Sequence, residues 1–569
     1  MSSSTISAPT FFKTHDVENQ PTPLPAYNLW EQDALLKHAV LTNLTSPNAD
    51  PTTAPNAKIE TQLSTFGKVV GFELMEHGEL ANKNKPEFHP FDRYGRRIDD
   101  VAFHPSYHAL MNAAMFGNVH NYSWQNESQQ GAHVVRAALI FMQSQADAGT
   151  TCPLTMTHAA IPALRQAKDL PNYWVDKVVH GQYDSRTLAA EQKNGLSIGM
   201  GMTEKQGGSD VRRNTTTATK QQDGSYRIVG HKFFFSAPMC DGHLILAQTD
   251  AGLGCFLLPR VMPDGTLNEV RIQRLKDKLG DWSNASSEVE FQGATAHLIG
   301  EEGRGVRVII DMVSLTRLDC MIGSSASMRQ ALVQAHHHVS NREAFGAKLI
   351  SQPLMQNVIA DLTLECTASL ALTMRVARAV DASKTDLKEA ALARIATAIG
   401  KYWICKRTPA FINEAQECLG GIGYVEENIL PRLYRQAPLN SIWEGSGNVQ
   451  CLDVLRALNK EPESKAALFD LLNSAKGKNA FYDIHLQSLI DSFEDTATLE
   501  IRSRIITEQT ALAMQAALLI NDVDNVMADT FCEARLGKQQ GLVFGTLPAT
   551  TPFEDIIERG ALVLKSEEK

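Results

Sequence analysis

The sequence lacks the patterns that mark several classes of protein. Its nine cysteines never form a Cys-x-x-Cys pair, so we expect buried, reduced thiols rather than a disulfide framework or a zinc site. No apolar run approaches the roughly 20 residues needed to span a bilayer. The N-terminus, from Met1 to Lys13, has neither the basic start nor the continuous apolar core of a secretory signal. These absences predict a soluble cytoplasmic protein that does not bind membranes.

Positive charge is also scarce. The chain has 54 Lys and Arg against 64 Asp and Glu, a formal charge of −10. Such a surface gives no overall attraction to nucleic acid or to anionic membranes. A chain of 569 residues with 43% hydrophobic and 21% charged residues is instead typical of a packed globular protein with several domains.

The composition and the spacing of apolar residues change several times along the chain. We expect an extended N-terminal arm because its start is rich in Ser, Thr, Asn and Pro, then helical, β-rich and again helical regions. The predicted segments are the arm (1–57), an N-terminal helical domain (58–195), a middle β-domain (196–305), a helical bundle (306–458) and an additional C-terminal helical domain (459–569). The fold class is therefore mixed, mainly α with a central β-domain.

Short runs typical of strands occupy the middle region without intervening helices, which predicts an antiparallel barrel or sandwich rather than a parallel sheet. These runs are Tyr226–Val229, Lys232–Ser236, His243–Gln248, Cys255–Pro259 and Glu288–Phe291. Apolar residues at three- and four-residue spacing then predict long helices. The predicted helices are Val306–Asn341, Leu354–Val380, Leu387–Thr408, Asn448–Leu458 and, in the tail, Leu499–Ile520.

A glycine-rich string from Gly199 to Val211 is the strongest local signal. Its glycines, Thr203 and Ser209 would present backbone N–H groups and hydroxyls to a phosphate or a flavin. A plain surface loop has the same composition. The string is neither a P-loop nor a dinucleotide-binding fingerprint, because it has no Gly-Lys-Ser/Thr and is followed by strands.

Two further strings carry candidate chemistry. Trp443-Glu444-Gly445 sets a carboxylate beside a large aromatic side chain, which could desolvate the acid, although a surface Glu in a turn is the common alternative. Asn341 to Gly346 ends a predicted helix with an Arg and a Phe that could grip a phosphate and stack on a planar ring. The alternative there is an ordinary helix end with a Gly stop.

Together these strings resemble the acyl-CoA dehydrogenase family, whose order of helical, β and helical domains also matches. In that family Thr-Glu-x-x-x-Gly-Ser-Asp lines the flavin, here from Thr203 to Asp210. The Arg-x-x-Phe-Gly motif, here Arg342 to Gly346, reaches the flavin of a neighbouring subunit. The aromatic-Glu-Gly motif carries the base, which the resemblance assigns to Glu444. The implied reaction is α,β-dehydrogenation of an acyl-CoA thioester with FAD as cofactor, in a homotetramer built as a dimer of dimers.

The resemblance implies a set of site residues around the flavin and the thioester. Those expected to bind FAD are Met202, Thr203, Gly208, Ser209, Phe234, Phe235, Ser236, Arg342, Phe345, Gln352, Glu417, Gly420, Gly421, Trp443, Ser446 and Asn448. Those expected to contact substrate are Ser209, Arg317 and Trp443. One subgroup of the family places its base immediately before the Arg matched by Arg317. Thr316 stands there in this chain, so Glu444 is the better candidate.

Several strings look closest to the AidB branch of the family, flavoproteins of the alkylation-damage response. Among them are Leu275 to Gly280 and Ser441 to Asn448. This resemblance implies an alternative role, in which the protein binds and shields DNA with little dehydrogenase turnover. The tail argues against it, because residues 461–569 hold ten basic and eighteen acidic side chains, a formal charge of −8.

The electron acceptor and metal binding are two further questions. An acyl-CoA oxidase would use the same motifs and pass electrons to oxygen, and the sequence leaves the acceptor open. His336-His337-His338 could suggest a metal site. Successive side chains on a helix point about 100° apart, so three adjacent histidines cannot share one ion, and we expect no metal.

Overall fold

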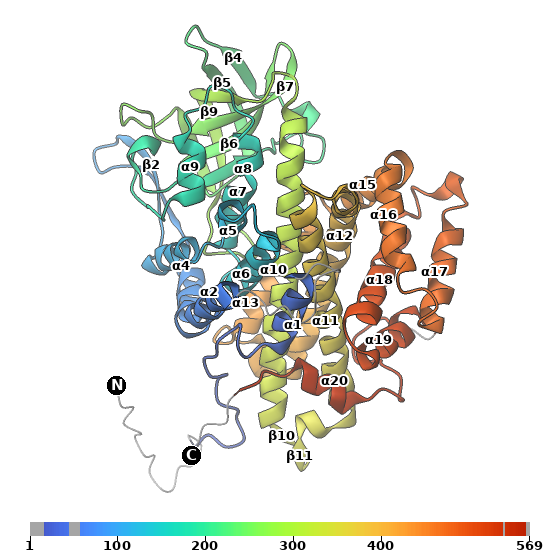
Figure 1. Ribbon diagram of the computed structural model, residues 1–569. Helices are drawn as coiled ribbons and strands as arrows, with labels where there is room; N and C mark the ends of the chain where they lie inside the picture. Colours follow the sequence, from blue (N-terminus) through green and yellow to red (C-terminus); the bar gives the residue numbers. More distant parts are fainter. Residues whose placement is uncertain (1–15, 45–56, 539–540, 565–569) are drawn as a thin grey trace.

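The computed structural model describes residues 16–44, 57–538 and 541–564. Figure 1 shows a strand-rich domain at one end of a long helical bundle, with the C-terminal helices along the side of the bundle. One helix, α10 (Gly305–Asn341), runs from the strand-rich domain to the opposite end of the molecule. None of the helices in the described ranges is long and apolar enough to cross a membrane.

The first segment differs from the extended arm predicted for it. Residues 34–44 form a helix, and Trp30 and Leu36 are fully buried. The prediction was wrong there because apolar side chains among the Pro-rich turns pack against the helical core, which composition alone did not indicate. Two parts of the predicted arm, residues 1–15 and 45–56, lie outside the described residues.

Helices and one hairpin make up the N-terminal region. Every residue of α6 is buried, as its broadly apolar sequence predicts. The elements are α1 (Ala34–Leu44), α2 (Ala57–Val69), a π-helical turn η2 (Val70–Leu74), α3 (Met75–Lys83), β1 (Glu87–Phe91), β2 (Arg97–Ala102), α4 (Pro105–Phe116), α5 (Tyr122–Gln125), α6 (Ala132–Ala146), α7 (Thr151–Ala159), α8 (Ile161–Leu164) and α9 (Tyr173–His180).

The β-domain is a seven-stranded sheet that closes on itself. Its strands are β3 (Ile198–Gly201), β4 (Thr217–Lys220), β5 (Tyr226–Ser236), β6 (Gly242–Thr249), β7 (Gly252–Pro259), β8 (Val270–Leu275) and β9 (Ser286–Ile299). Pairing runs β5–β4–β6–β7–β9 and returns to β5, which makes a barrel. Most pairs are antiparallel, but β6 lies parallel to β3 and β4, so the antiparallel prediction holds only in part.

Two predicted strands are one strand in the structure. The runs Tyr226–Val229 and Lys232–Ser236 join in β5, which continues through Gly230. Gly230 has φ +148°, and a Cβ there would lie 2.6 Å from the Cα of Thr216. Only glycine allows this backbone angle and close approach. Gly230 therefore lies within one strand and does not mark a turn between two.

The bundle is built on three long helices with short connections: α10, α11 (Pro353–Ala382) and α12 (Leu387–Cys418). The prediction ended the last of these at Thr408, but the helix continues through Pro409 because Phe411, Ile412 and Ala415 are buried beyond it. This packing compensates for the lost backbone hydrogen bond. Shorter elements complete the region: β10 (Glu343–Ala344), β11 (Ala347–Lys348), η6 (Gly420–Tyr424), α13 (Ile429–Gln436), α14 (Leu439–Ile442) and α15 (Gly447–Lys460).

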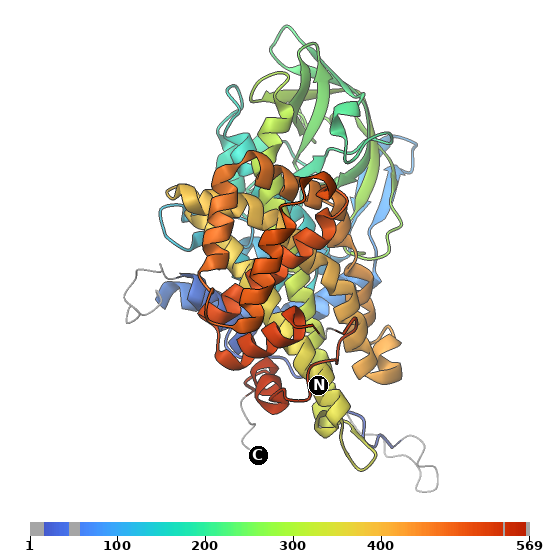
Figure 2. The same cartoon turned by 90° about the vertical axis from the view of Figure 1, so that its right-hand side faces the viewer.

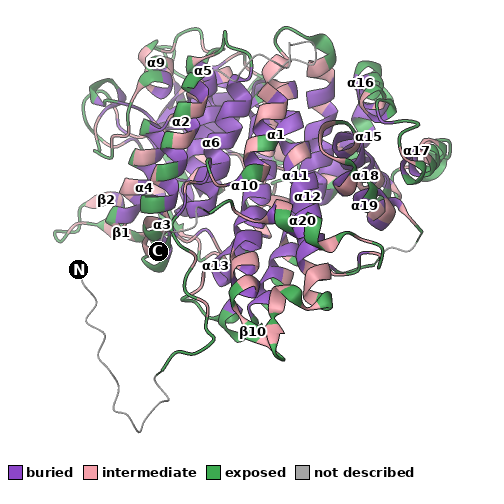
Figure 3. Ribbon diagram, turned by 60° about the horizontal axis from the view of Figure 1, so that its bottom comes forward, coloured by how far each residue is buried: buried purple, intermediate pink, exposed green. Residues whose placement is uncertain are grey.

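The tail packs on the bundle as part of the same hydrophobic core. Figure 2 shows the tail helices in front of the bundle, and Figure 3 shows α18 beside the bundle and α17 at the outer edge. Met514 and Phe531 belong to the buried cluster that also contains Leu139 and Ile399 from the other helical regions. The tail elements are α16 (Pro462–Asn473), α17 (Ala480–Ser492), α18 (Ser503–Asp522), α19 (Asn525–Phe531) and α20 (Phe553–Gly560).

All nine cysteines are buried and unpaired. The scattered spacing of the thiols predicted buried thiols without disulfides, and the structure confirms this. Among the described residues no group of three or more His, Cys, Asp or Glu side chains is placed to hold a metal ion.

Candidate active site

Glu444 lies on a tight turn between α14 and α15. Its backbone is left-handed, with φ +56°, and Gly445 follows with φ +95°. A non-glycine residue in this region is uncommon and persists only where its surroundings hold it. The conformation of Glu444 is therefore imposed by neighbouring side chains.

Three side chains hold this turn by its carbonyl oxygens. Lys401 of α12 donates to Trp443 O at 2.8 Å and to Gly445 O at 2.5 Å. Arg317 of α10 donates from Nε to Glu444 O at 3.0 Å, and Gln450 Nε2 reaches Glu444 O and Gly445 O at 3.1 and 2.9 Å. Three consecutive carbonyls thus have side-chain donors, which accounts for the strained backbone.

The carboxylate of Glu444 is half-buried and makes one hydrogen bond. Thr316 Oγ1 donates to its Oε2 at 2.6 Å, while Oε1 has no hydrogen-bond partner among the described residues. Thr316 stands where one family subgroup carries its base. In this chain that residue supports Glu444 instead.

Arg317 has a different environment from the one implied by the resemblance. Its guanidinium binds Glu444 O and pairs with Asp453 Oδ2 at 2.8 Å. Asp453 also binds Arg394. The structure therefore places Arg317 in the support of the turn, with its Nε and Nη1 bound to Glu444 O and Asp453.

Trp443 joins the turn to the N-terminal region and the barrel. Its Nε1 donates to Asn440 Oδ1 at 2.9 Å. The indole packs at the edge of an apolar cluster that also takes in Met202 and buried Met156 and Leu315. Met202 and Trp443, two candidate cofactor residues far apart in sequence, thus pack against the same buried cluster.

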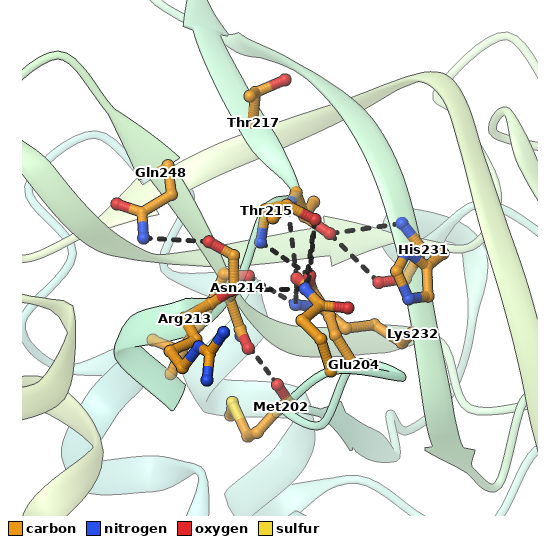
Figure 4. A network of polar contacts seen from close by, with 12 residues as sticks. Met202, Glu204, Arg213, Asn214, Thr215, Thr217, His231, Lys232 and Gln248 are labelled. Carbon is orange, nitrogen blue, oxygen red and sulfur yellow. Dashed lines mark hydrogen bonds and ion pairs between the residues drawn. The ribbon is translucent and has the colours of Figure 1, made fainter. Parts of the chain in front are cut away.

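A buried ion pair shapes the glycine-rich loop (Figure 4). Glu204 and Lys232 are fully buried, with Oε1 and Nζ 2.7 Å apart. Burial opposes the charge on Glu204, but Lys232 and hydrogen bonds from Thr215 and Thr216 outweigh it and lower the pKa of Glu204 to about 2. Burial likewise lowers the pKa of Lys232, to about 8.

The Glu204–Lys232 ion pair holds one residue of the loop inside the protein, and the residues that follow lie at the surface. Gly208 and Ser209 are exposed and Thr203 is half-buried, so their amides and hydroxyls face a ligand or solvent. The loop therefore has the form that a flavin site needs, with a polar rim on a rigid base.

The aromatic run on β5 divides between the two faces of the strand. Phe234 is 48% exposed, whereas Phe235 is 1% exposed and stacks on His243 inside the barrel. Side chains alternate along a strand, so neighbours cannot both face one ligand. The side chain of Phe235 therefore lies inside the barrel, away from the face that carries Phe234 and half-buried Ser236.

Ser446 and Asn448 follow the turn at the start of α15, and both are exposed. The Asn448 side chain is already bound, because Arg504 of α18 donates to its Oδ1 at 2.9 Å. The tail thus contacts the catalytic string directly, a connection that the sequence did not indicate.

The remaining candidates lie far from Glu444 in this chain: Arg342, Phe345, Gln352, Glu417, Gly420 and Gly421. Arg317 and Arg342 share α10 and its end, and at 1.5 Å rise per residue they are about 37 Å apart. Figure 1 shows β10 and β11 at the end of the bundle opposite the barrel. A flavin held by Met202 and Trp443 cannot also reach Arg342 of the same chain.

This second group nevertheless has the form of a binding surface. Phe345 is fully exposed with φ +54°, and Cβ atoms added at Gly420 and Gly421 would meet only open space. Glu417 is exposed and accepts from Asn413, and Gln352 donates to Ala344 O. An exposed aromatic ring can stack on a planar ring, and the adjacent Arg342 has the chemistry to bind phosphate.

Lys401, Gln450 and Asn440 are residues of this site that the sequence motifs did not indicate. A signal existed for Lys401, because it is a charged residue in line with the apolar residues Ala398, Ile404 and Cys405 at helical spacing. Such a residue is seldom buried without a polar role.

Comparison with known proteins identifies the family. The adaptive response protein AidB N-terminal domain matches residues 19–185, the acyl-CoA dehydrogenase middle domain residues 199–294 and the acyl-CoA dehydrogenase C-terminal domain residues 303–459. The chain is 47% identical over 537 residues to the putative acyl-CoA dehydrogenase AidB of Escherichia coli (strain K12), covering 93% of this chain and 96% of that protein.

Comparison with nematode relatives supports the same family assignment. Acyl-CoA dehydrogenase family member 11 of Caenorhabditis elegans is 28% identical over 84% of this chain and 79% of its own. The crystal structure of Caenorhabditis elegans ACDH-11 in complex with C11-CoA superposes with a TM-score of 0.80 at 26% identity, covering 92% of each chain. The chain therefore belongs to the acyl-CoA dehydrogenase family, whose members are FAD-dependent flavoproteins, in the branch that carries the AidB N-terminal domain.

Proposed function

We propose that this FAD-dependent oxidoreductase of acyl-CoA dehydrogenase type removes the α- and β-hydrogens of an acyl-CoA thioester, with Glu444 as the base. The observation that carries the proposal is the state of Glu444. Its Oε2 is held by Thr316, its Oε1 is free of partners among the described residues, and three side-chain donors fix its backbone. A general base needs this combination of a free oxygen and a fixed position.

The role of Glu444 begins with the α-proton, which its Oε1 accepts. Negative charge then develops on the thioester oxygen and has to be stabilised by hydrogen-bond donors. The backbone N–H of Glu444 is such a donor, since it has no acceptor among the described residues. FAD, when bound, supplies the acceptor for the hydride that leaves the β-carbon.

The substrate class rests on family membership and on the relative solved with C11-CoA. The loop Thr203–Ser209, Phe234 and Trp443 would hold the flavin on the Glu444 side. Since Arg342, Phe345 and Gly420 lie at the other end of the bundle, we infer that they serve the flavin of a second copy. A cofactor site that needs two chains requires at least a dimer, and the family resemblance extends this to a homotetramer built as a dimer of dimers.

We further infer a role in fatty acid metabolism in the cytoplasm, which nine buried, unpaired thiols favour. A DNA-shielding role has less support. Residues 461–569 carry eighteen acidic against ten basic side chains, so the tail as a whole repels rather than attracts phosphates.

Glu444→Gln tests the proposal. The amide keeps the shape and the backbone N–H but cannot accept the proton, so we expect flavin reduction by acyl-CoA thioesters to slow about 10³-fold while FAD stays bound. The measurement is anaerobic flavin bleaching across a series of acyl chain lengths, with exposed Glu463→Gln on α16 as the matched control. Bleaching of the Glu444 variant at the wild-type rate would show that another residue is the base.

The same experiment addresses the oxidase alternative. Admitting oxygen to the bleached wild-type protein and following the return of flavin absorbance measures direct reoxidation. A slow return, over minutes, supports a dehydrogenase that needs another acceptor, and a return within one turnover supports an oxidase.

A further inference from the structure

Lys401 is a cation in the core of the bundle. Its side chain is 1% exposed on α12, and among the described residues it forms no ion pair with a carboxylate. Its two hydrogen bonds go instead to backbone carbonyls, those of Trp443 and Gly445. A buried charge without a counter-ion is costly, so its retention points to a use for that charge.

The bond to Trp443 O fixes the direction of the next N–H group. No cis peptide bonds occur in the described chain, so the Trp443–Glu444 peptide is trans and planar. In such a plane the C=O and the N–H point in opposite directions. Since the carbonyl points at Lys401, the Glu444 N–H points away from α12, and it has no acceptor among the described residues.

The other supports of the turn act on different atoms. Arg317 and Gln450 bind the carbonyls of Glu444 and Gly445, which belong to later peptides. Of the described side chains, only Lys401 contacts Trp443 O. An ammonium on that oxygen draws electron density from the amide and makes the opposite N–H a stronger donor.

We propose that Lys401 is a positioning residue for the oxyanion site: its ammonium aims and polarises the Trp443–Glu444 peptide so that the Glu444 N–H binds the thioester oxygen. This inference rests on the proposed function. It gives the buried charge a task that a neutral donor performs less well, since polarisation depends on charge and not only on a hydrogen bond.

Two substitutions at Lys401 and one at a neighbour separate polarisation from support of the turn. Lys401→Met keeps the approximate length of the side chain and removes its charge and both of its hydrogen bonds. Lys401→Gln keeps a neutral donor and serves as well if the Met variant does not fold. Gln450→Met is the matched control, because it removes donors to the same turn and leaves Trp443 O bound.

The probe is para-dimethylaminocinnamoyl-CoA, a chromophoric thioester that is already unsaturated and cannot be dehydrogenated. Its absorbance shifts to the red when its carbonyl oxygen is hydrogen-bonded. With flavin-loaded protein we expect the full red shift for wild type and a partial one for Gln450→Met, in which the turn is less well held but Trp443 O stays bound. We expect a smaller shift still for Lys401→Gln and none for Lys401→Met. Flavin reduction by a saturated thioester should slow about 10- to 100-fold in Lys401→Met, in kcat more than in KM.

Three results would overturn the inference. A red shift of wild-type size in Lys401→Met would show that the ammonium has no role. If Gln450→Met loses the shift as completely as Lys401→Met does, Lys401 merely supports the turn. A wild-type protein that reduces its flavin but leaves the probe unshifted places the oxyanion site elsewhere. Failure of the wild type to reduce its flavin with any thioester would instead contradict the proposed function, and the inference with it.

Discussion

Thr316 Oγ1 donates a 2.6 Å hydrogen bond to Glu444 Oε2, joining the middle of α10 to the turn before α15. Thr316 is 2% exposed, so this bond is shielded from water. A hydrogen bond to a charged group is stronger than one between neutral groups. The contact therefore selects one orientation of the Glu444 carboxylate and leaves its other oxygen free.

Thr316→Val removes this hydrogen bond at nearly constant volume. We expect flavin reduction by a saturating thioester to slow about 10-fold, because hydrogen bonds to charged groups contribute roughly 1.5 kcal/mol or more. Single-turnover stopped-flow absorbance measures the rate. Thr316→Ser keeps the hydroxyl and is expected to stay near the wild-type rate, and a Val variant as fast as the Ser variant would show that the bond has no role in orienting the base.

Arg342→Ala is expected to lose FAD and to loosen the oligomer together, because Arg342 would bind the cofactor of a second copy. Flavin content and size-exclusion chromatography with light scattering measure the two effects. A stable, fully flavinated monomer would contradict the shared site.

The structure supplies a control for that variant. Arg342 Nη1 also binds Asn19 O at 2.5 Å, and Asn19 makes two hydrogen bonds of its own with Glu343. Asn19→Ala therefore weakens the N-terminal contact and keeps the guanidinium. We expect it to retain FAD, and loss of FAD in Asn19→Ala would assign the effect to the N-terminal segment.

Acid is expected to destabilise the fold through buried histidines. His120, His133 and His158 lie around Trp124, and burial lowers the pKa of the first two to about 3 and that of His158 well below its ordinary value. Between these values and the unfolded value near 6.5, the unfolded chain binds more protons. Stability is thus fully present above about pH 6.5 and falls by about 1.4 kcal/mol per pH unit for each histidine below it.

Urea unfolding at pH 7 and pH 5.5 measures this dependence. His133→Phe removes one of the buried titrating groups, so its stability should fall less between the two pH values. His180→Phe, at an exposed position, is the control and should keep the wild-type dependence. Equal pH dependence in all three proteins would contradict the assignment.

Duplex DNA is expected to bind weakly, with Kd on the order of 10⁻⁴ M at physiological salt. Gel shifts of the intact protein across salt concentrations measure it. Truncation at residue 461 is not a clean test, because Met514 and Phe531 belong to the common core. The double variant Lys476→Ala/Lys478→Ala alters an exposed basic pair instead. Tight, steeply salt-dependent binding that this variant abolishes would restore the DNA-shielding role.

Local features of the chain were predicted well where one signal dominates. The long helix Val306–Asn341 was predicted within one residue of α10, because its apolar spacing is continuous. Signals that depend on context were less reliable. Pro409 would normally end a helix, yet packing around Phe411 carries α12 through it, and β5 continues through Gly230.

The sequence by itself determined the family and its cofactor, and it supplied the flavin motifs and Glu444 as candidates for the site, because these depend on residue type and local spacing. Only the tertiary structure decided which side chains meet. It buried Phe235 in the barrel, brought Lys401, Arg317 and Gln450 to the carbonyls around Glu444, and set Arg342 at the far end of α10. The physical reason is that these contacts join residues on different helices and strands, whose relative positions follow from packing of the whole core rather than from any local pattern.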